Sequence, residues 1–404
     1  MNISILGLGY VGITAAACLI KEGHSVTGID PDLEKIKQIN NSQSPVNEAG
    51  VEELISEGIK LRSFKASNKL GPHLKKDDIC IICVGTPSNE DGSNNIHFIE
   101  KASLELAMAL KDLKRRKPLS IIYRSTIPPG TMEKIVLKIF DDNLNDFSSK
   151  INLIYNPEFL REGTAVEDYF NPPKVVIGSL NGEKDKLVDE LYKNIKSKFF
   201  YTRFPESEMT KLIDNSWHAL KVSYANEIGR LSEKLGLNSE IVNEIFTSDT
   251  KLNISKYYLK PGEPFGGSCL PKDVRAIQFL SKDTNPILSN ILQSNLEHQN
   301  FLYQRLLKRI RKTDRILVNG IAFKKNTDDL RESPNLDAVS RLIADGFNVK
   351  IFDKCLSDEV HSRMFDYSKL LGVDLKKVLL KKYKIDNFDI VIDMHNDFKD
   401  KNID

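Results

Sequence analysis

Short apolar runs alternate with stretches of helical spacing through the first half of the chain. The runs have the length of strands buried on both faces, and they occupy residues 3–6, 25–29, 79–84, 119–123, 151–155 and 174–177. Strands that alternate with helices predict a mostly parallel sheet with helices packed on both faces. This half of the chain is therefore expected to form a doubly wound α/β domain.

The hydrophobic spacing changes near residue 207. Residues 209–236 contain no proline and predict one long helix, and helical spacing continues to about residue 281. Strand-like runs return at residues 314–320, 348–352 and 389–392, with helical stretches between them. The expected fold class is α/β, with two Rossmann-like doubly wound domains joined by a helical middle domain that contains the long helix.

Composition and charge exclude several classes of function. The 404 residues are 40% hydrophobic and 28% charged, and a net charge of +2 gives no reason to expect nucleic acid or a membrane surface as partner. No apolar run approaches the roughly 18 residues of a membrane span, and the N-terminus lacks the basic start and cleavage site of a signal peptide. We expect a cytoplasmic protein.

The five cysteines are an odd and scattered set, which fits a reducing compartment, at positions 18, 80, 83, 269 and 355. Cys80 and Cys83 have the spacing of a metal or redox pair. They lie in an apolar run, however, and no second pair of cysteine or histidine ligands follows. Buried strand cysteines explain them better, and we expect no metal site.

The first apolar run leads directly into the sequence GLGYVG, residues 7–12. Gly7 permits a tight turn, Gly9 lets a pyrophosphate approach the backbone, and Gly12 lets the following helix pack closely on the strand. Asp30, 18 residues beyond Gly12 at the end of the next strand, is placed to bind ribose hydroxyls and to repel a 2′-phosphate. The pattern predicts NAD rather than NADP. Lys35 fits a surface helix as well as a cofactor contact.

Polar side chains follow several of the later strands. Thr86 and Thr126 lie in turns at strand ends, where ligands bind in an open α/β sheet, so their hydroxyls are placed to touch cofactor or substrate. Residues 156–164 follow another strand and include Glu158 and Glu162, which would share one face if the segment were helical. Whether these acids serve a site or a solvated face stays open at this point.

The predicted long helix carries a polar stripe. At about 100° per residue, its members fall within an arc of roughly 80°, and they are Lys211, Asn215, His218 and Asn226. Amide and imidazole groups without an acid among them indicate a hydrogen-bonding face for a ligand. The opposite side is apolar and includes Ile213, Trp217, Leu220, Tyr224 and Ile228.

The segment FGGSCLPKD, residues 265–273, surrounds Cys269 with small and polar residues. Its two glycines let backbone pass close to a ligand, and Pro271 suits the start of a helix. A helix N-terminus and the neighbouring Lys272 would favour the reactive thiolate, whereas an inert buried cysteine is the alternative. Asp273 lies four residues beyond the sulfur.

An NAD-binding fold combined with a reactive thiol limits the reactions that the protein is expected to catalyse. Oxidation of an alcohol needs no nucleophile, but hydride transfer from an aldehyde requires the carbonyl to become tetrahedral first. A thiolate can form a thiohemiacetal, which loses hydride to give a thioester that water hydrolyses. The sequence therefore predicts an oxidoreductase that carries an alcohol through to the carboxylate.

The chain resembles the UDP-glucose/GDP-mannose dehydrogenase family along nearly its whole length. Besides the two motifs quoted above, the matching segments are CVGTPS (83–88), RSTIPPGT (124–131), NPEFLREGTAV (156–166) and GIAFKKNTDDLRESP (320–334). Residues 217–229 and 251–262 are most similar to the members that act on GDP-mannose in polysaccharide biosynthesis. The resemblance implies four-electron, NAD-dependent oxidation of a nucleotide-sugar at C6, from GDP-mannose to GDP-mannuronate.

The resemblance implies a role for each matching residue. The catalytic set would be Cys269 as nucleophile, Lys211 and Asn215 at the oxyanion, and, for water and proton transfer, Asp273, Glu158, Glu162 and Thr126. Contacts with NAD would come from Gly7, Gly9, Tyr10, Val11, Gly12, Asp30, Lys35, Thr86, Thr126, Lys272 and Arg331. Contacts with the nucleotide-sugar would come from Glu162, Lys211, Asn215, His218, Asn226, Tyr257, Tyr258, Lys260, Gly266 and Lys324.

The family architecture implies three domains. Residues 1–203 would form the NAD-binding Rossmann domain, residues 204–300 a helical central and dimerisation domain, and residues 301–404 a nucleotide-sugar-binding α/β domain. The apolar side of the long helix would form the surface of a homodimer.

Three features depart from the pattern of the members that act on GDP-mannose. Lys260 stands in place of an arginine, Glu263 stands in place of an apolar aromatic residue, and the C-terminal unit from about residue 314 is short. All three concern the nucleotide half of the substrate. UDP-glucose or a UDP-N-acetylhexosamine is therefore the alternative substrate, and a non-catalytic NAD- or nucleotide-sugar-binding regulator is the alternative of another class.

Overall fold

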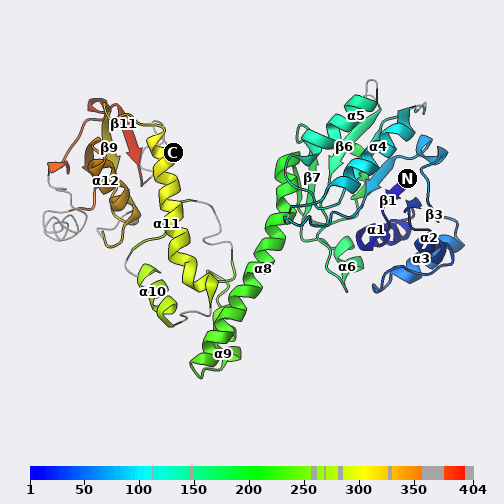
Figure 1. Ribbon diagram of the computed structural model, residues 1–404, viewed down its shortest axis with the longest axis horizontal. Coiled ribbons are helices and arrows are strands. Elements are labelled where there is room, and N and C mark those ends of the chain that lie inside the picture. Colours follow the sequence, from blue (N-terminus) through cyan, green and yellow to red (C-terminus); the bar gives the residue numbers. More distant parts are fainter. Residues whose placement is uncertain are drawn as a thin grey trace. The chain divides into compact units, whose positions relative to one another are not determined.

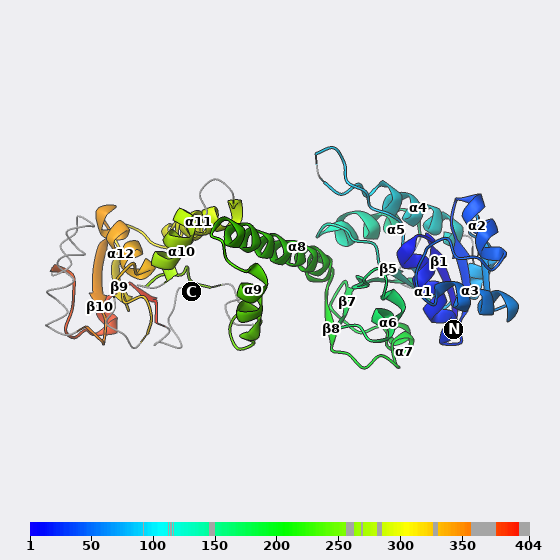
Figure 2. The same cartoon turned by 90° about the horizontal axis from the view of Figure 1, so that it is seen from below.

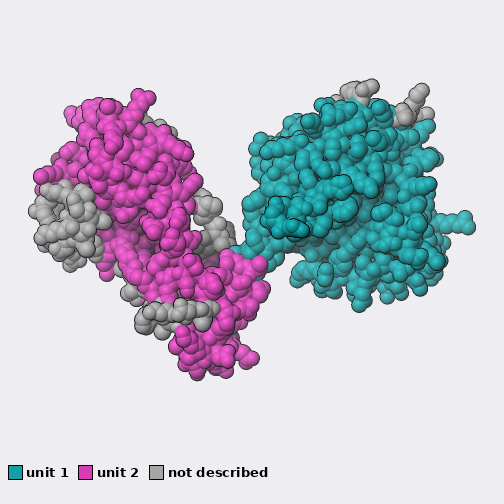
Figure 3. Space-filling view, viewed as in Figure 1, with its two compact units in different colours: residues 1–218 teal, residues 219–404 magenta. Residues whose placement is uncertain are grey.

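The computed structural model describes residues 1–91, 93–111, 113, 115, 117–144, 150–255, 262–267, 270–280, 285–325, 330–356 and 377–395. The chain forms two compact units, residues 1–218 and residues 219–404, which Figure 3 colours separately. Several residues with predicted roles lie outside the described residues, namely Cys269, Tyr257, Tyr258, Lys260 and the side chain of Lys272.

Unit 1 is built on one eight-stranded sheet with the strand order β3-β2-β1-β4-β5-β6-β7-β8 (Figure 1). Neighbouring strands are parallel except β6 and β7, which pair antiparallel. The order reverses between β1 and β4, and such a switch point opens a crevice for ligands. The strands are β1 Asn2–Leu6, β2 Ser25–Ile29, β3 Phe64–Ser67, β4 Ile79–Ile82, β5 Leu119–Tyr123, β6 Ile151–Tyr155, β7 Val175–Ser179 and β8 Phe199–Arg203.

Helices cover both faces of this sheet, as the sequence predicts (Figure 2). Successive side chains of β4 enter different cores, Ile81 with Ile55 of α3 on one face and Ile82 with Phe140 of α5 on the other. Burial on both faces explains why these strands are mostly apolar. The helices are α1 Tyr10–Lys21, α2 Leu33–Asn40, α3 Val51–Lys60, the 3-10 turn η1 Pro72–Lys75, α4 His97–Lys111, the π-helical turn η2 Met132–Val136, α5 Leu137–Asn143, α6 Ala165–Phe170 and α7 Lys186–Leu191.

Two strands of this sheet, β3 and β8, carry no apolar-run signal. Both lie at an edge of the sheet. β3 alternates between buried and more exposed positions over four residues, and the side chains of β8 are half-buried or exposed. Because many side chains of these two strands are only partly buried or exposed, neither strand needs a continuous apolar sequence.

A single helix of 31 residues, α8 Phe204–Lys234, confirms the predicted long helix and begins five residues before the predicted start at residue 209. Helices continue to α10 Leu270–Leu280, close to the predicted limit near residue 281, but turns interrupt them. α9 Ser239–Ser248 is followed by turns, in which the carboxylate of Asp249 accepts hydrogen bonds from the amides of Lys251 and Leu252, both at 2.9 Å. A side chain that captures backbone amides in this way ends a helix.

Unit 2 contains a parallel sheet in the order β10-β9-β11, so the second α/β unit is also confirmed. Its strands are β9 Arg315–Asn319, β10 Asn348–Phe352 and β11 Ile390–Asp393. The remaining helices are α10 Leu270–Leu280, α11 Pro286–Leu307, α12 Pro334–Ala344 and the 3-10 turn η5 Ile385–Asn387. Among the described residues, no helix is long and apolar enough to cross a bilayer.

Candidate functional site

The turn between β1 and α1 has the shape that a dinucleotide requires. A Cβ on Gly12 would lie 1.9 Å from the carbonyl oxygen of Gly7, and Gly7 itself has a φ of +90°. By contrast, a Cβ on Gly9 would meet nothing within 4 Å. Gly9 is also the N-cap of α1, and no side chain caps the helix there. Open space beside uncapped helix amides fits a pyrophosphate group.

Asp30 lies at the end of β2 beside this turn. Its carboxylate accepts hydrogen bonds from the amides of Leu8 at 2.8 Å and Asp32 at 3.0 Å, and it pairs with the ammonium of Lys35 at 2.9 Å. The structure thus brings Lys35 to Asp30 at the predicted cofactor turn. A carboxylate fixed at the end of β2 fits the ribose hydroxyls of NAD.

Thr86 and Thr126 lie beyond the ends of β4 and β5, next to the switch point. The hydroxyl of Thr86 donates to the carbonyl oxygen of Thr126 at 2.8 Å, so the two turns are joined. Tyr10 and Val11 are half-buried in the first turn of α1. The predicted cofactor residues of unit 1 therefore lie along the sheet edge where NAD would bind.

Lys211 of α8 and Glu158 of the loop after β6 form an ion pair at 3.0 Å. Their side chains are 11% and 13% exposed, respectively. The Lys211 ammonium also lies 5.7 Å from the ring centre of Phe159. Asn215, one helical turn beyond Lys211, is exposed, as is His218. A shielded ammonium beside exposed hydrogen-bonding groups can stabilise negative charge on a bound ligand.

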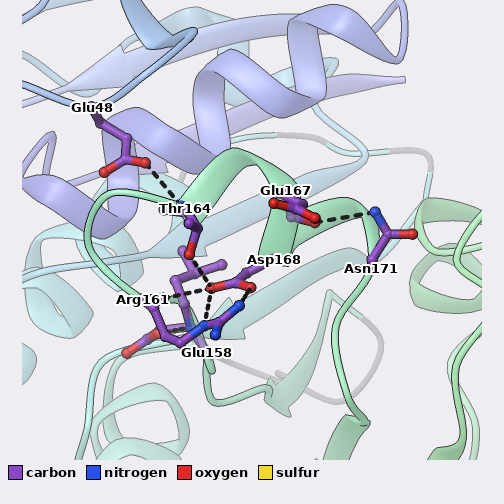
Figure 4. Close-up of polar contacts among 9 residues, drawn as sticks. Glu48, Glu158, Arg161, Thr164, Glu167, Asp168 and Asn171 are labelled. Carbon is purple, nitrogen blue, oxygen red and sulfur yellow. Dashed lines mark hydrogen bonds and ion pairs between the residues drawn. The ribbon is translucent and has the colours of Figure 1, made fainter.

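The loop that carries Glu158 and Glu162 is not a helix, so these two acids do not share a helical face. Residues 156–164 are irregular, and α6 begins only at Ala165. Glu158 turns its carboxylate toward Lys211, whereas Glu162 is exposed. The loop conformation comes from hydrogen bonds to side chains outside the segment (Figure 4).

Asp168 of α6 is one of those side chains. It forms a bidentate pair with Arg161, at 2.6 and 3.0 Å, and also accepts from the amide of Arg161 and the hydroxyl of Thr164. Glu48, from the segment before α3, accepts from the amides of Gly163 at 2.7 Å and Ala165 at 2.9 Å. These contacts replace the hydrogen bonds that a helix would supply.

Three buried acids near the site are not predicted by the sequence patterns, and they are Glu48, Asp168 and Glu208. Glu208 accepts from the amides of Gly130 and Met132, at 2.5 and 2.7 Å, and so ties the turn after β5 to α8. Its spacing three residues before Lys211 on the long helix is a signal that could have identified it. Glu48 offers no such signal, because its partners lie 38 to 117 residues away in the sequence. The partners of Asp168 lie four and seven residues before it, within an irregular loop.

In unit 2, the two glycines before Cys269 pack against the chain itself. A Cβ on Gly266 would lie 2.5 Å from the carbonyl oxygen of Glu332, and a Cβ on Gly267 would lie 2.9 Å from the ring of Phe323. Packing within the chain therefore already requires the small size of both glycines, and their predicted role beside a ligand stays a prediction. Arg275 of α10 pairs with Glu332 at 2.5 Å and reinforces this contact.

The remaining predicted residues of unit 2 are accessible to ligands. Asn226 on α8 and Lys324 after β9 are exposed. Asp273 in the first turn of α10 and Arg331 before α12 are exposed as well. The accessibility of these four side chains is compatible with the roles that the resemblance implies for them.

Cys80 and Cys83 are buried, in and directly after β4, as predicted. Burial raises the pKa of both thiols, that of Cys83 to about 12, so neither is available as a thiolate near neutral pH. Among the described residues, no group of three histidine, cysteine, aspartate or glutamate side chains could hold a metal ion.

Comparison with known proteins covers nearly the whole chain. Three parts of the UDP-glucose/GDP-mannose dehydrogenase family match, the NAD binding domain at residues 1–196, the central domain at residues 205–297 and the UDP binding domain at residues 317–403. The chain is 37% identical to the GDP-mannose 6-dehydrogenase of Pseudomonas putida, over 97% of this chain and 90% of that protein. It is 33% identical to a UDP-glucose 6-dehydrogenase of Bacillus subtilis, over 87% of this chain and 79% of that protein.

A solved structure matches as well. The ternary complex of GDP-mannose dehydrogenase from Pseudomonas aeruginosa superimposes with a TM-score of 0.87 at 33% identity, over 97% of this chain and 90% of that one. The glycine turn between β1 and α1, the strand order and the family matches all indicate a dinucleotide-binding dehydrogenase. The chain therefore belongs to the UDP-glucose/GDP-mannose dehydrogenase family, as an NAD-dependent nucleotide-sugar dehydrogenase.

Proposed function

We propose that the protein oxidises GDP-mannose at C6 to GDP-mannuronate, with two NAD and one water consumed per sugar. The observation that carries the proposal is the similarity, along 97% of the chain, to a GDP-mannose 6-dehydrogenase. Because the similarity covers nearly the whole chain, it includes the proposed catalytic motifs and the proposed nucleotide-sugar contacts. Because C6 is a primary alcohol, the carboxylate is reached through two successive two-electron oxidations.

Residues of unit 1 would hold NAD and the charge that develops at C6. When bound, NAD accepts the hydride of each oxidation. Gly9 leaves room for the pyrophosphate, and Asp30 accepts from the ribose. The Glu158 carboxylate lies 3.0 Å from the Lys211 ammonium and holds that side chain in place. An ammonium held in this way stabilises an oxyanion at C6, with Asn215 as a second donor.

Cys269 would act in the second oxidation. Its thiolate adds to the C6 aldehyde to form a thiohemiacetal, and the loss of hydride leaves a thioester. Water then adds to the thioester carbonyl, the carbon–sulfur bond breaks, and the acid and the thiol are released. Asp273, Glu162 and Thr126 are proposed to orient this water and to take its proton, since each is a hydrogen-bonding residue of the matching motifs.

A UDP-sugar is the second candidate substrate. The chain is 33% identical to a UDP-glucose 6-dehydrogenase, and Lys260 and Glu263 both depart from the GDP-mannose pattern. An ammonium at residue 260 lacks the planar fork of a guanidinium, so it offers less discrimination between base edges. The four-electron chemistry would be unchanged, because none of these departures involves the catalytic set.

A homodimer in the cytoplasm is also proposed. Large apolar side chains are exposed along α8 in the single chain, including Ile213, Trp217 and Leu220. Exposed apolar side chains at helical spacing are typical of a subunit interface. Among the described residues, Cys18, Cys80, Cys83 and Cys355 are free thiols, which suits a reducing compartment. The product, a sugar acid on a nucleotide, suits the biosynthesis of an acidic polysaccharide.

Counting NADH per sugar tests the substrate. The purified protein is incubated with limiting GDP-mannose, UDP-glucose or a UDP-N-acetylhexosamine, and NADH is measured at completion. Two NADH per GDP-mannose supports the proposal, whereas two per UDP-sugar and none with GDP-mannose would replace it with the second candidate. One NADH per sugar would exclude the carboxylate as product.

The thioester step has its own test. We expect Cys269→Ser to abolish formation of the acid and to leave the dissociation constant for NAD unchanged. Cys355→Ser, which alters a half-buried free thiol elsewhere in the chain, is the matched control and should retain full turnover. Undiminished acid production by the Cys269 variant would contradict a thioester route.

A further inference from the structure

Glu48 connects two segments that are far apart in the sequence. Glu48 lies between α2 and α3, outside the motifs of the cofactor turn and the catalytic loop, and it is only 6% exposed. Its carboxylate accepts from the hydroxyl of Tyr10, in the first turn of α1, and from the amides of Gly163 at 2.7 Å and Ala165 at 2.9 Å. Figure 4 shows Glu48 beside the loop that leads into α6.

All of these partners are hydrogen-bond donors. Burial disfavours the charged form, but hydrogen bonds from Tyr10, Gly163 and Ala165 together hold the pKa of the Glu48 carboxyl below its usual value. An ionised carboxylate is an acceptor on both oxygens and therefore satisfies the three donors. An amide in its place would turn an N–H group toward at least one donor.

The loop held by Glu48 leads back to the proposed catalytic pair. Asp168 fixes the loop at Arg161 and Thr164, and Glu48 fixes it at Gly163 and Ala165. A loop anchored at neighbouring points has few conformations available to it. Within the same loop, Glu158 accepts from the amide of Leu160 at 2.7 Å and pairs with Lys211.

We propose that Glu48 is a positioning residue that joins loop 156–164 to the cofactor turn and thereby sets the placement of the Glu158–Lys211 pair. The Tyr10 hydroxyl is the contact through which the cofactor turn acts on this loop. The proposal rests on the proposed function, in which Tyr10 contacts NAD and Lys211 stabilises the oxyanion at C6.

Hydrogen exchange measured by mass spectrometry tests the anchoring without any turnover. In Glu48→Gln, exchange of the peptide that contains the amides of Gly163 and Ala165 should become faster by about tenfold or more, because charge-assisted bonds to both amides are lost. Exchange in β5 and β6 should be unchanged. Glu53→Gln, on the exposed side of α3, is the control and should leave the loop unchanged.

NAD provides the second arm of the exchange experiment. Added NAD should slow exchange in residues 156–165 of the wild type, and Tyr10→Phe, which removes one hydroxyl, should abolish most of that protection. Tyr10→Phe also covers the case in which Glu48→Gln does not fold. Unchanged loop exchange in Glu48→Gln, or full protection by NAD in Tyr10→Phe, would overturn the proposal.

Kinetics separate positioning from a general loss of stability. For Glu48→Gln we expect kcat to fall by about tenfold while KM for the nucleotide-sugar changes by less than about twofold, since the change affects charge stabilisation rather than ground-state binding. Faster loop exchange with an unchanged kcat would refute the link to Lys211. If the wild type oxidises no nucleotide-sugar, the proposed function fails, and the exchange experiment still decides whether Glu48 anchors the loop.

Discussion

Lys211 and Glu158 form a largely shielded ion pair between α8 and the loop after β6. Because their side chains are only 11% and 13% exposed, neither charge is well solvated when its partner is removed. A second pair lies close by, in which Lys174 bonds to Asp214 at 2.6 Å and lies 4.7 Å from the ring centre of Phe159. Two lysines thus contact the same aromatic ring, but only Lys211 is a proposed oxyanion residue.

This difference gives a prediction with an internal control. Lys211→Ala should lower kcat on the order of 10²- to 10³-fold, because a charged donor to the oxyanion is lost, while the dissociation constant for NAD stays within about twofold. The measurement is steady-state turnover together with titration of NAD by protein fluorescence. Lys174→Ala breaks the neighbouring ion pair and should change kcat by less than about threefold. Equal losses in both variants would show that the effect is structural.

The element that positions the cofactor is the turn between β1 and α1, in which the glycines serve different purposes. Gly12 is required by the protein, since its Cβ would lie 1.9 Å from a carbonyl oxygen. Gly9 is not required for packing, because its Cβ would meet nothing within 4 Å and its φ of −73° suits other residues. The space at Gly9 is therefore left for a ligand.

Alanine substitutions separate these two purposes. Gly12→Ala should lower the free energy of unfolding by about 1–3 kcal/mol, measured by urea denaturation, because the added methyl group overpacks the turn. Gly9→Ala should leave the unfolding curve unchanged. It should raise the dissociation constant for NAD by about tenfold or more, since the methyl group occupies the space for the pyrophosphate. Unweakened NAD binding in the Gly9 variant would contradict the proposed cofactor position.

Elements buried on both faces are the ones that the sequence predicts well. Strands β5 and β6 are mostly apolar and contribute side chains to both cores, and their bounds match the prediction. The edge strands β3 and β8 lack this constraint and show no such run. The loop at residues 156–164 is also missed, since its shape depends on Glu48 and Asp168 rather than on its own spacing.

At the scale of the whole molecule, the exposed apolar side chains of α8 are the feature that a single chain leaves unexplained. Ile213 is 51% exposed and Leu220 is 44% exposed. Burying such side chains in an interface stabilises association by about 1.5–3 kcal/mol each. A second copy of the chain is the proposed partner.

Charged substitutions test the dimer. We expect the double variant Ile213→Glu with Leu220→Glu to weaken association by about a hundredfold or more, so that sedimentation equilibrium reports one chain instead of two. Leu61→Glu is the matched control, because Leu61 is 68% exposed on α3's C-terminal side and lies outside α8. A wild type that sediments as one chain would remove the basis for the dimer.

The sequence by itself determined the features that depend on neighbouring residues. Apolar periodicity predicted most strands and the long helix, and the glycine spacing with Asp30 predicted the NAD turn, because each reflects the local geometry of the backbone. Only the tertiary structure decided that Tyr10 and Gly163 meet at Glu48, and that Glu158 pairs with Lys211 instead of sharing a helical face with Glu162. The physical reason is that a buried carboxylate takes whichever donors the fold brings to it, and spacing along the chain does not encode such distant partners.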